Sequence, residues 1–343
     1  MTHDMNSKER VIRTITFDHP DRIPVDLWYF PGTVARHGKA FQDLLTKYPS
    51  DITDIDYKNP FHGYKQLYKK GTFTDVWKIT WVNIKEGIMG QPKRHPLQNW
   101  SALRNYRMPS HLINEGWEEV DASLHRNQDR FVTAPRVSVF ERMQFLRGTE
   151  NLLMDLAEEP AELYILRDML FEYNAKFLQK VVSYSGIDAV VFGDDWGSQQ
   201  SLLISPGMWR KFFKPIYQGL FDIARSAGKY IFFHSDGYIM DIYDDLIELG
   251  VKAINSQVRC MGVEKLGRRF AGKVTFWGEI SRQHTLPWGT PEQVKSAAKL
   301  MRQQFCVKGG GLIGAGEAGP DVPLANIEML LRAWNASKGV KHG

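Results

Sequence analysis

Short apolar runs alternate with amphipathic stretches along most of the chain. The apolar runs, rich in β-branched and aromatic residues, predict buried strands at Arg130–Phe140, Asp188–Asp195, Tyr230–Phe233, Lys252–Val258, Val274–Ile280 and Gly310–Ala318. Helical periodicity predicts helices between them, at Thr149–Tyr184 (two helices), Ser205–Ala227, Ile239–Leu249, Val263–Phe270, Pro291–Phe305 and Asn326–Ser337. Strands that alternate with helices in this way indicate parallel βαβ units.

Some of these helices carry clear signals at their N-termini. Ser205 is a typical N-cap and is followed by a proline at the first helical position. Thr290 and Gln293 have the spacing of a capping box. Pro160 marks the start of the second helix within Thr149–Tyr184.

The first 130 residues are less regular. They predict a leading helix within Met1–Phe17, a strand from Ile23, a helical stretch through Leu44–Leu45 and a short strand at Asp51–Asp56. Thr74–Val82 predicts one arm of a small antiparallel excursion.

About eight strands in 343 residues favour a (β/α)8 TIM barrel, formed as a single domain over residues 1–343, rather than an open doubly wound sheet. No predicted strand runs directly into a GxGxxG phosphate loop, which also argues against a dinucleotide-binding fold.

Composition narrows the function classes further. A hydrophobic fraction of 43% with 12% aromatic residues is enough for a large core. The net charge of +5 is spread along the chain without a basic block, so nucleic acid is not an expected partner. The absence of a long apolar run or signal pattern predicts a soluble, cytoplasmic protein with no membrane contact. Cys260 and Cys306 lie far apart and are expected to be free thiols. The sequence is also compatible with a homodimer.

Polar residues recur where the predicted strands end. They are Asp194 and Asp195, His234 and Asp236, Asn255 and Gln257, Glu279, and Glu317. In a parallel barrel the carboxyl ends of the strands share one face, where the βα loops open. The sequence therefore predicts a shared polar pocket on that face.

The residue types suggest roles in this pocket. His234 can bind a metal or transfer protons near neutral pH, although its stretch also fits a strand end at which Asp236 caps the next helix. Asp236, Glu279 and Glu317 can bind a metal or donate a proton. Asp194 and Asp195 point to opposite faces of their strand, and we assign Asp194 to the pocket.

Aromatic residues also gather near the predicted strand ends. Core packing is expected for about half of them, and the others are candidates to line a pocket for a flat substrate. With Gln257, the candidates for substrate binding are Trp28, Trp196, Tyr238 and Trp277.

Several of these segments together resemble the uroporphyrinogen decarboxylase superfamily. The similarity lies in GDDWGSQQSLLISPGMWRKFFKPIY, FFHSDGYI, LIELGVKAINSQV, FWGEISRQHTLPWGTPEQV and GPDVPLANIEML, with DHPDRIPVDLW and TDVWKITW in the first part of the chain. The resemblance implies a (β/α)8 barrel. It also implies one of two chemistries, which are decarboxylation of uroporphyrinogen and methyl transfer linked to a corrinoid.

The chain departs from the decarboxylase pattern at its entry loop. The decarboxylases grip their substrate's carboxylates with an arginine-rich stretch of the RQAGRY type. The stretch that resembles it here, Trp28–Gly38, retains only Arg36 in a loosely similar place. Asp75 is similar in position to the family's pyrrole-facing aspartate. A substrate with eight carboxylates needs several cations, so haem biosynthesis is not expected.

The chain also departs from the coenzyme M methyltransferases, which bind zinc through a His-x-Cys pair and a later cysteine. His234 is similar to the first of these ligands, but Asp236 and Glu317 stand where the two cysteines would be. Without the thiolates a thiol substrate is not expected, while a His/carboxylate site can still hold zinc.

The sequence hypothesis is therefore a corrinoid-dependent methyltransferase that moves a methyl group from a small methoxylated or methylated compound to a separate corrinoid protein. His234, Asp194, Glu279 and Asp75 are its candidate catalytic residues, and His234, Asp236 and Glu317 its candidate metal ligands. The alternatives are a decarboxylase of a small acid and a non-catalytic barrel that binds a tetrapyrrole or corrinoid.

Overall fold

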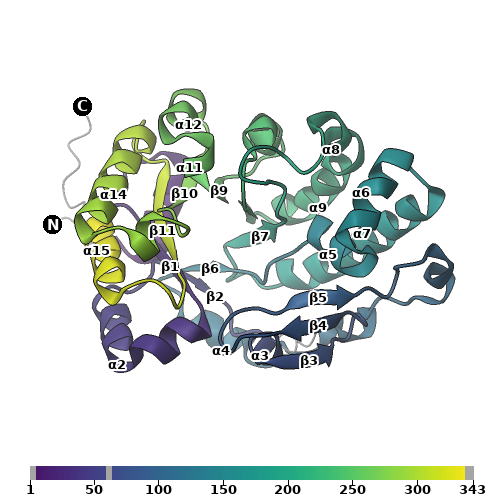
Figure 1. Cartoon of the computed structure of the whole chain (residues 1–343). Coiled ribbons are helices and arrows are strands. Elements are labelled where there is room, and N and C mark those ends of the chain that lie inside the picture. The colour runs from purple at the N-terminus through teal and green to yellow at the C-terminus, as the bar shows by residue number, and fades with distance from the viewer. Residues whose placement is uncertain (1–4, 59–63, 337–343) are drawn as a thin grey trace.

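The computed structural model describes residues 5–58 and 64–336. Within them, eight parallel strands form a sheet in the order β1-β11-β10-β9-β8-β7-β6-β2, which curves into a nearly closed barrel (Figure 1). The strands are β1 (Val25–Tyr29), β2 (Ile52–Asp54), β6 (Phe131–Thr133), β7 (Ala189–Gly193), β8 (Tyr230–Ser235), β9 (Ala253–Ser256), β10 (Thr275–Glu279) and β11 (Leu312–Ala318). The predicted (β/α)8 TIM barrel is confirmed.

A buried aspartate links β1 and β2, the first and last strands of this order. The backbone N–H of Asp51, just before β2, donates to Val25 O of β1 at 2.8 Å. The Asp51 carboxylate is fully buried and accepts from Arg10 Nη1 (2.7 Å), Arg22 Nη1 (2.7 Å) and Val25 N (2.7 Å). The pairing of this charge with two arginines ties helix α1 (Ser7–Thr16) to the barrel floor.

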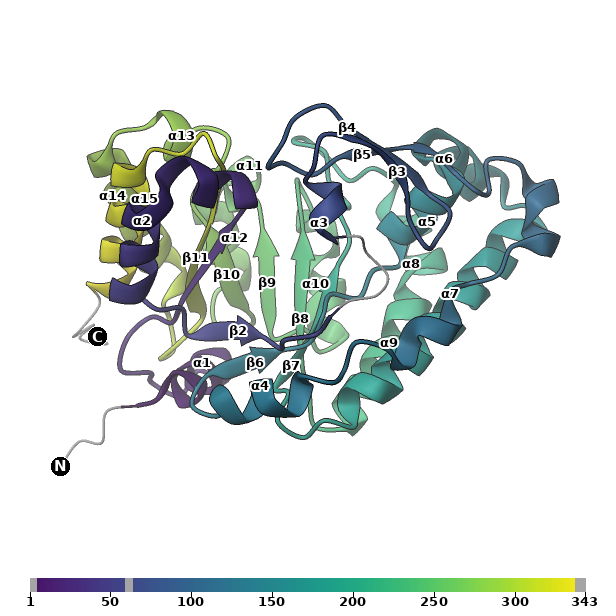
Figure 2. The same ribbon diagram turned by 90° about the horizontal axis from the view of Figure 1, so that it is seen from below.

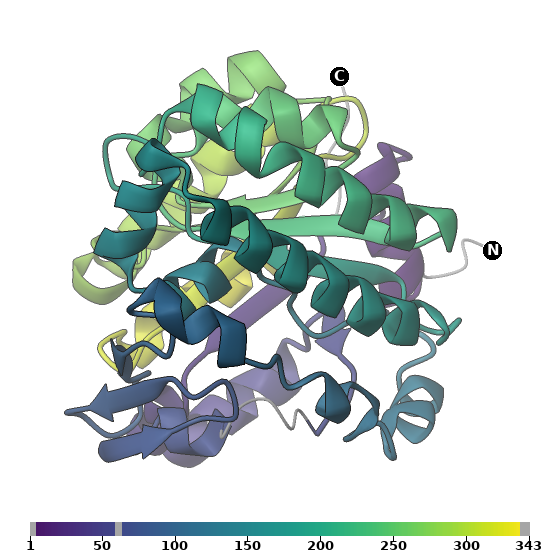
Figure 3. The same cartoon turned by 90° about the vertical axis from the view of Figure 1, so that its right-hand side faces the viewer.

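Helices cover the outside of the barrel, and Figure 3 shows the long teal helices crossing it. The helices after β1 and β6 are α2 (Pro31–Lys47), α5 (Phe140–Arg147), α6 (Thr149–Glu158) and α7 (Ala161–Val182). The later ones are α8 (Pro206–Phe212), α9 (Lys214–Ser226), α10 (Tyr243–Glu248), α11 (Val258–Met261), α12 (Val263–Phe270), α13 (Thr285–Trp288), α14 (Pro291–Phe305) and α15 (Leu324–Asn335). Among the described residues, no helix is both long and apolar enough to cross a membrane.

The strands alternate between two hydrophobic clusters. The inner cluster fills the barrel with one set of strand residues, including Ala189, Val191 and Phe232, and is closed from below by Val11 and Ile15 of α1. The other set of strand residues, including Val190, Phe192 and Phe233, packs outward beneath the helices. Because side chains alternate along a strand, the inward and outward positions of each strand show which polar residue at its end faces the barrel interior.

A small antiparallel sheet of β3 (Gly71–Thr74), β4 (Thr80–Asn83) and β5 (Gln91–Arg94) lies near the carboxyl ends of the barrel strands, opposite α1 (Figure 2). The predicted excursion is therefore present, but Thr74–Val82 is not one arm of it. The segment contains the β3–β4 turn, because the Asp75 carboxylate accepts from the backbone N–H groups of Trp77 (2.9 Å) and Ile79 (3.0 Å).

Two other predicted boundaries are wrong. The strand predicted at Arg130–Phe140 ends at Thr133, two residues before Pro135, and only Val137 resumes pairing, with Phe192. The helix predicted at Ser205–Ala227 is divided into α8 and α9 at Phe213. The Ser205 cap, the Thr290–Gln293 capping box and the helix boundary at Pro160 are confirmed.

Candidate active site

The polar residues that the sequence places at strand ends meet at one end of the barrel. Their register shows how they meet, since His234 of β8 pairs with Gly193 of β7 on one side and with Asn255 of β9 on the other. His234 has the same parity as Phe232 of the inner cluster and therefore faces the barrel interior. Gln257, Glu279 and Glu317 each lie two or four positions after an inward-facing residue of their own strand, and therefore also point toward the barrel interior.

The loops after β7 and β8 are held together by close backbone contact. Gly197 N donates to Asp236 O at 3.2 Å, and Tyr238 N donates to Ser198 O at 2.7 Å. Gly237 has φ +77°, and a Cβ added there would lie 2.1 Å from Gly197 O, so glycine is required. This contact places Asp195 and Asp236 side by side, and Asp195 Oδ1 accepts from Asp236 N at 2.9 Å.

The imidazole of His234 has a fixed orientation. Asn255 donates through Nδ2 to Trp277 O at 2.7 Å, which leaves its Oδ1 to accept from His234 Nδ1 at 2.6 Å. Nδ1 therefore carries a proton, and Nε2 faces Asp195 Oδ1 at 3.4 Å and Asp236 Oδ1 at 3.8 Å. One imidazole nitrogen and two carboxylates thus converge on one point.

The charges in this group stabilise one another. Burial and the Arg136 charge act to lower the pKa of His234, but the hydrogen bond to Asp195 and the charges of Asp195 and Asp236 outweigh them, so the pKa is raised. Burial acts to raise the pKa of Asp195, but its hydrogen bond to His234 and the charges of His234 and Arg136 hold that pKa well below its usual value. Both shifts favour a pair in which a protonated His234 faces an ionised Asp195.

The same three residues fit a divalent cation. Ligand atoms of Asp195, His234 and Asp236 all lie within 4.8 Å of one another. A His/carboxylate set suits zinc and similar ions, and the Asn255 contact on Nδ1 is the support that metal-binding histidines typically have. A bound ion would take the place of the Nε2 proton of His234.

Arg282, in the loop after β10, bridges two of the predicted pocket carboxylates. Its Nη1 contacts Glu317 Oε1 at 2.6 Å, and its Nη2 donates to Asp236 Oδ2. Glu317 is thus held by an arginine and does not join Asp195, His234 and Asp236. Of the three predicted metal ligands, the structure brings His234 and Asp236 together, with Asp195 in the place predicted for Glu317.

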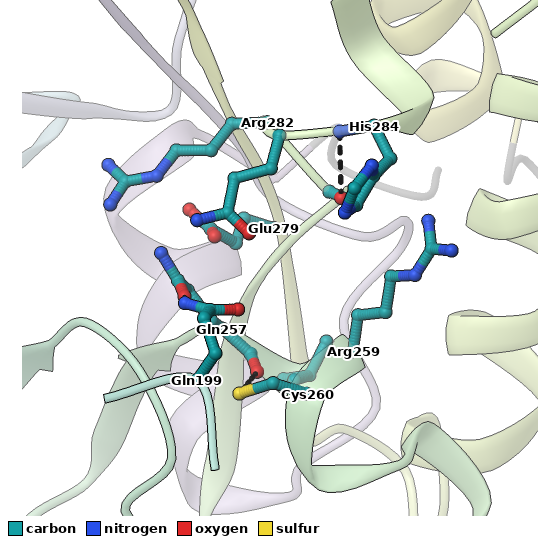
Figure 4. Close-up of a pocket in the computed structure, with 10 residues that line it drawn as sticks. Gln199, Gln257, Arg259, Cys260, Glu279, Arg282 and His284 are labelled. Carbon is teal, nitrogen blue, oxygen red and sulfur yellow. Dashed lines mark hydrogen bonds between the residues drawn. The ribbon is translucent and has the colours of Figure 1, made fainter. Parts of the chain in front are cut away.

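Glu279 opens into a pocket of about 190 Å³ next to this group. Figure 4 shows Glu279, Gln257 and Arg282 on one side of the pocket and Arg259 and His284 on the other. Glu279 is only 5% exposed. Burial raises its pKa to about 8, and the charges of Asp236 and Glu317 add to this rise while Arg282 and His234 oppose it. Glu279 therefore holds its proton at neutral pH.

Asp194 faces away from the pocket, so its predicted place there is wrong. Side chains alternate along β7, so Asp194 points to the same side as Val190 and Phe192, which pack outward beneath the helices. Its buried carboxylate accepts from Ser138 Oγ (2.8 Å), Glu141 N (2.8 Å) and Tyr217 Oη (2.5 Å), which anchors the start of α5. Asp195 occupies the position expected for Asp194.

Other predicted residues have structural surroundings. Asp75 is buried in the β3–β4 turn and also accepts from Trp81 Nε1 at 2.8 Å. Trp196 is fully buried and stacks on Phe140 with ring centroids 3.9 Å apart, so it is core and does not line a pocket. Tyr238 is half-buried and packs against the outer cluster. These three environments do not support the predicted roles.

Two tryptophans lie beneath the site. Trp277 is 2% exposed and donates to the buried Asp26 at 3.0 Å. Trp28 donates to the same carboxylate at 2.8 Å, and its half-buried ring lies 5.3 Å from that of His234. Of the predicted aromatic residues, Trp28 therefore lies against the candidate site, and Trp277 supports it from below.

Sequence reasoning missed two arginines and a glutamate. The sequence pattern does not point to Arg282, because this residue lies beyond the end of its strand. Arg136 lies over Gly193, where an added Cβ would be 1.8 Å from its Nε, and it pairs with Glu141 Oε2 at 2.7 Å. The glycine at the end of β7, which makes room for a long side chain, is the signal that sequence could have offered.

Comparisons with known proteins bear on family and fold. The sequence model described as uroporphyrinogen decarboxylase (URO-D) matches residues 131–336. A search of curated protein sequences finds no match. The fold is similar to that of a methyltransferase from Methanosarcina mazei, with a TM-score of 0.68 at 15% identity over 97% of this chain and 99% of that chain. A 3-keto-D-glucoside 4-epimerase from E. coli aligns over 71% of this chain and 96% of its own at 14% identity, but its TM-score of 0.40 is too low to argue from.

Proposed function

Because the chain belongs to the uroporphyrinogen decarboxylase family, we propose that it is a corrinoid-dependent methyltransferase of that family. Its substrate would be a small methoxylated or methylated compound, and its partner a separate corrinoid protein in the cytoplasm. The fold shared with a methyltransferase supports this choice between the family's two chemistries. The whole chain, residues 1–343, would act as one domain.

One observation carries the proposal. A buried carboxylic acid that keeps its proton at neutral pH, Glu279, opens into a small pocket beside a histidine flanked by two aspartates. Methyl transfer from an ether needs a proton for the departing oxygen, and a carboxyl with a raised pKa is suited to supply it. By contrast, the pocket lining includes just two arginines, too few to grip a substrate with many carboxylates.

In this proposal each residue around the pocket has a separate role. Glu279 donates its proton to the oxygen or nitrogen that loses the methyl group. Gln257, 8% exposed and on the same side of the pocket, donates a hydrogen bond to the substrate. Arg282 holds Asp236 and Glu317 in place beside Glu279 and limits the negative charge there. Trp28 covers the His234 side.

Two groups would be supplied from outside the chain. The corrinoid of the partner protein is a co-substrate that accepts the methyl group. Zinc, if bound, would be held by Asp195, His234 and Asp236 and would act as a Lewis acid toward the substrate heteroatom. In its absence a protonated His234, which the raised pKa favours, would supply the positive charge at the same place.

The test is methyl transfer to free cob(I)alamin with a panel of methoxyaromatic compounds and methylamines, followed by the visible spectrum of the corrinoid. We expect a methylated corrinoid with at least one donor and loss of this activity in His234→Ala. No methyl transfer with any donor, together with release of CO2 from an aromatic or pyrrolic acid, would refute the proposal in favour of a decarboxylase. Metal analysis of wild type and His234→Ala then tests the zinc site.

A further inference from the structure

The pocket beside Glu279 is built from groups whose hydrogen-bonding capacity is not used within the protein. Glu279 is 5% exposed and Gln257 is 8% exposed. Gln257 Oε1 accepts from Gln199, but its NH2 group and the Glu279 carboxyl have no hydrogen-bond partner among the described residues. Both groups face the pocket, so a ligand there can take up their free hydrogen-bonding positions.

The opposite side of the pocket is lined by Arg259 and His284, which can donate hydrogen bonds to an anion. Arg259 forms no ion pair with any described residue, and its guanidinium makes a long contact of 3.4 Å with Thr285 Oγ1. His284 lies on the same side (Figure 4). The lining holds two arginines, Arg259 and Arg282, and one carboxyl, that of Glu279. Arg282 is already held by two carboxylates, which leaves Arg259 to bind an anion.

The size of the pocket limits what can bind. Its volume of about 190 Å³ is below the range of about 300–1,000 Å³ that is usual for drug-sized ligands. A molecule that reaches both sides must therefore be small. It must also offer an acceptor atom to Gln257 and Glu279 at one end and an anionic group at the other.

We propose that Arg259 makes the enzyme selective for small carboxylic acids, whose carboxylate it binds while Gln257 and Glu279 contact the methylated heteroatom. The planar guanidinium matches a carboxylate through two parallel hydrogen bonds. The contact of Gln257 and Glu279 with a methylated heteroatom rests on the proposed function. The binding of a carboxylate by Arg259 does not depend on it.

Calorimetric titration of the whole protein with 3-methoxybenzoate and with neutral 3-methoxybenzamide tests this inference without any turnover. Wild type should bind the acid about tenfold more tightly than the amide, as expected for a charge-assisted contact at a partly exposed site. Arg259→Gln should remove this preference by weakening acid binding alone. Arg268→Gln, which removes an exposed arginine of α12 outside the pocket lining, should retain it.

Equal affinity for the acid and the amide in wild type, binding of neither, or a preference that survives in Arg259→Gln would each overturn the inference. Arg259 is exposed, so its replacement should leave the melting temperature unchanged. A clear preference for the acid without methyl transfer would refute the proposed function and leave the carboxylate site standing.

Discussion

The role of Glu279 gives the sharpest prediction, because its protonation state is set by the structure. Its carboxyl is 5% exposed, lies near the charges of Asp236 and Glu317, and has a pKa of about 8. Replacement by glutamine keeps the size and the hydrogen-bonding capacity but removes the transferable proton. General acids typically contribute about 100- to 10,000-fold, so Glu279→Gln should lower kcat/KM for a methyl ether at pH 7 by at least about 100-fold.

The dependence on pH follows from the same pKa. A general acid works while it is protonated, so wild-type activity should fall as pH rises through about 8, and Glu279→Gln should lack this alkaline limb. A donor such as 4-nitroanisole, whose leaving group needs no proton, should be much less sensitive to the substitution. Initial rates between pH 6 and 9.5 with both donors measure these effects.

Stability provides an independent readout for Glu279. Its pKa in the folded protein is about 8, above the value of 4.5 for a free glutamate, so its contribution to stability is complete below pH 4.5 and is lost between 4.5 and about 8. The shift sets an upper limit of about 5 kcal/mol on this loss. Glu279→Gln should therefore be stabilised relative to wild type at pH 9 but not at pH 5 in urea titrations. An unchanged pH–rate profile in Glu279→Gln and no stability difference between these pH values would show that Glu279 is not a protonated general acid.

Three further predictions concern the framework and the aspartate pair. Asp51→Ala should destabilise the fold by about 3–5 kcal/mol, since it leaves two arginines at the barrel floor without their buried counter-charge, and a shift of the urea midpoint measures this. Gly237→Ala should lower both the melting temperature and activity, because its Cβ would lie 2.1 Å from Gly197 O; normal stability would show that the loops can separate without cost. Asp195→Asn should lower activity more than Asp194→Asn does, whereas Asp194→Asn, which replaces a fully buried and hydrogen-bonded carboxylate, should lower the melting temperature more; the reverse pattern would indicate that Asp194 is the residue of the site.

The sequence predicts the barrel well because its strands and helices follow strong local patterns. It also places His234, Gln257 and Glu279 correctly at strand ends that share one face. It could not choose between Asp194 and Asp195, because β7 is apolar on both faces and gives no sign of which parity points inward. It also could not anticipate the Arg282 bridge, since that contact depends on the path of a loop.

The methyl group that this site is proposed to move to a corrinoid can be followed by isotope labelling. A single turnover with a donor whose methoxy group carries deuterium, mixed with cob(I)alamin and analysed by mass spectrometry, tests this transfer most directly. We expect the label to reach cobalt and one molecule of demethylated product to form for each labelled methyl group. An unlabelled corrinoid, with the donor's methoxy group intact and CO2 released, would contradict it.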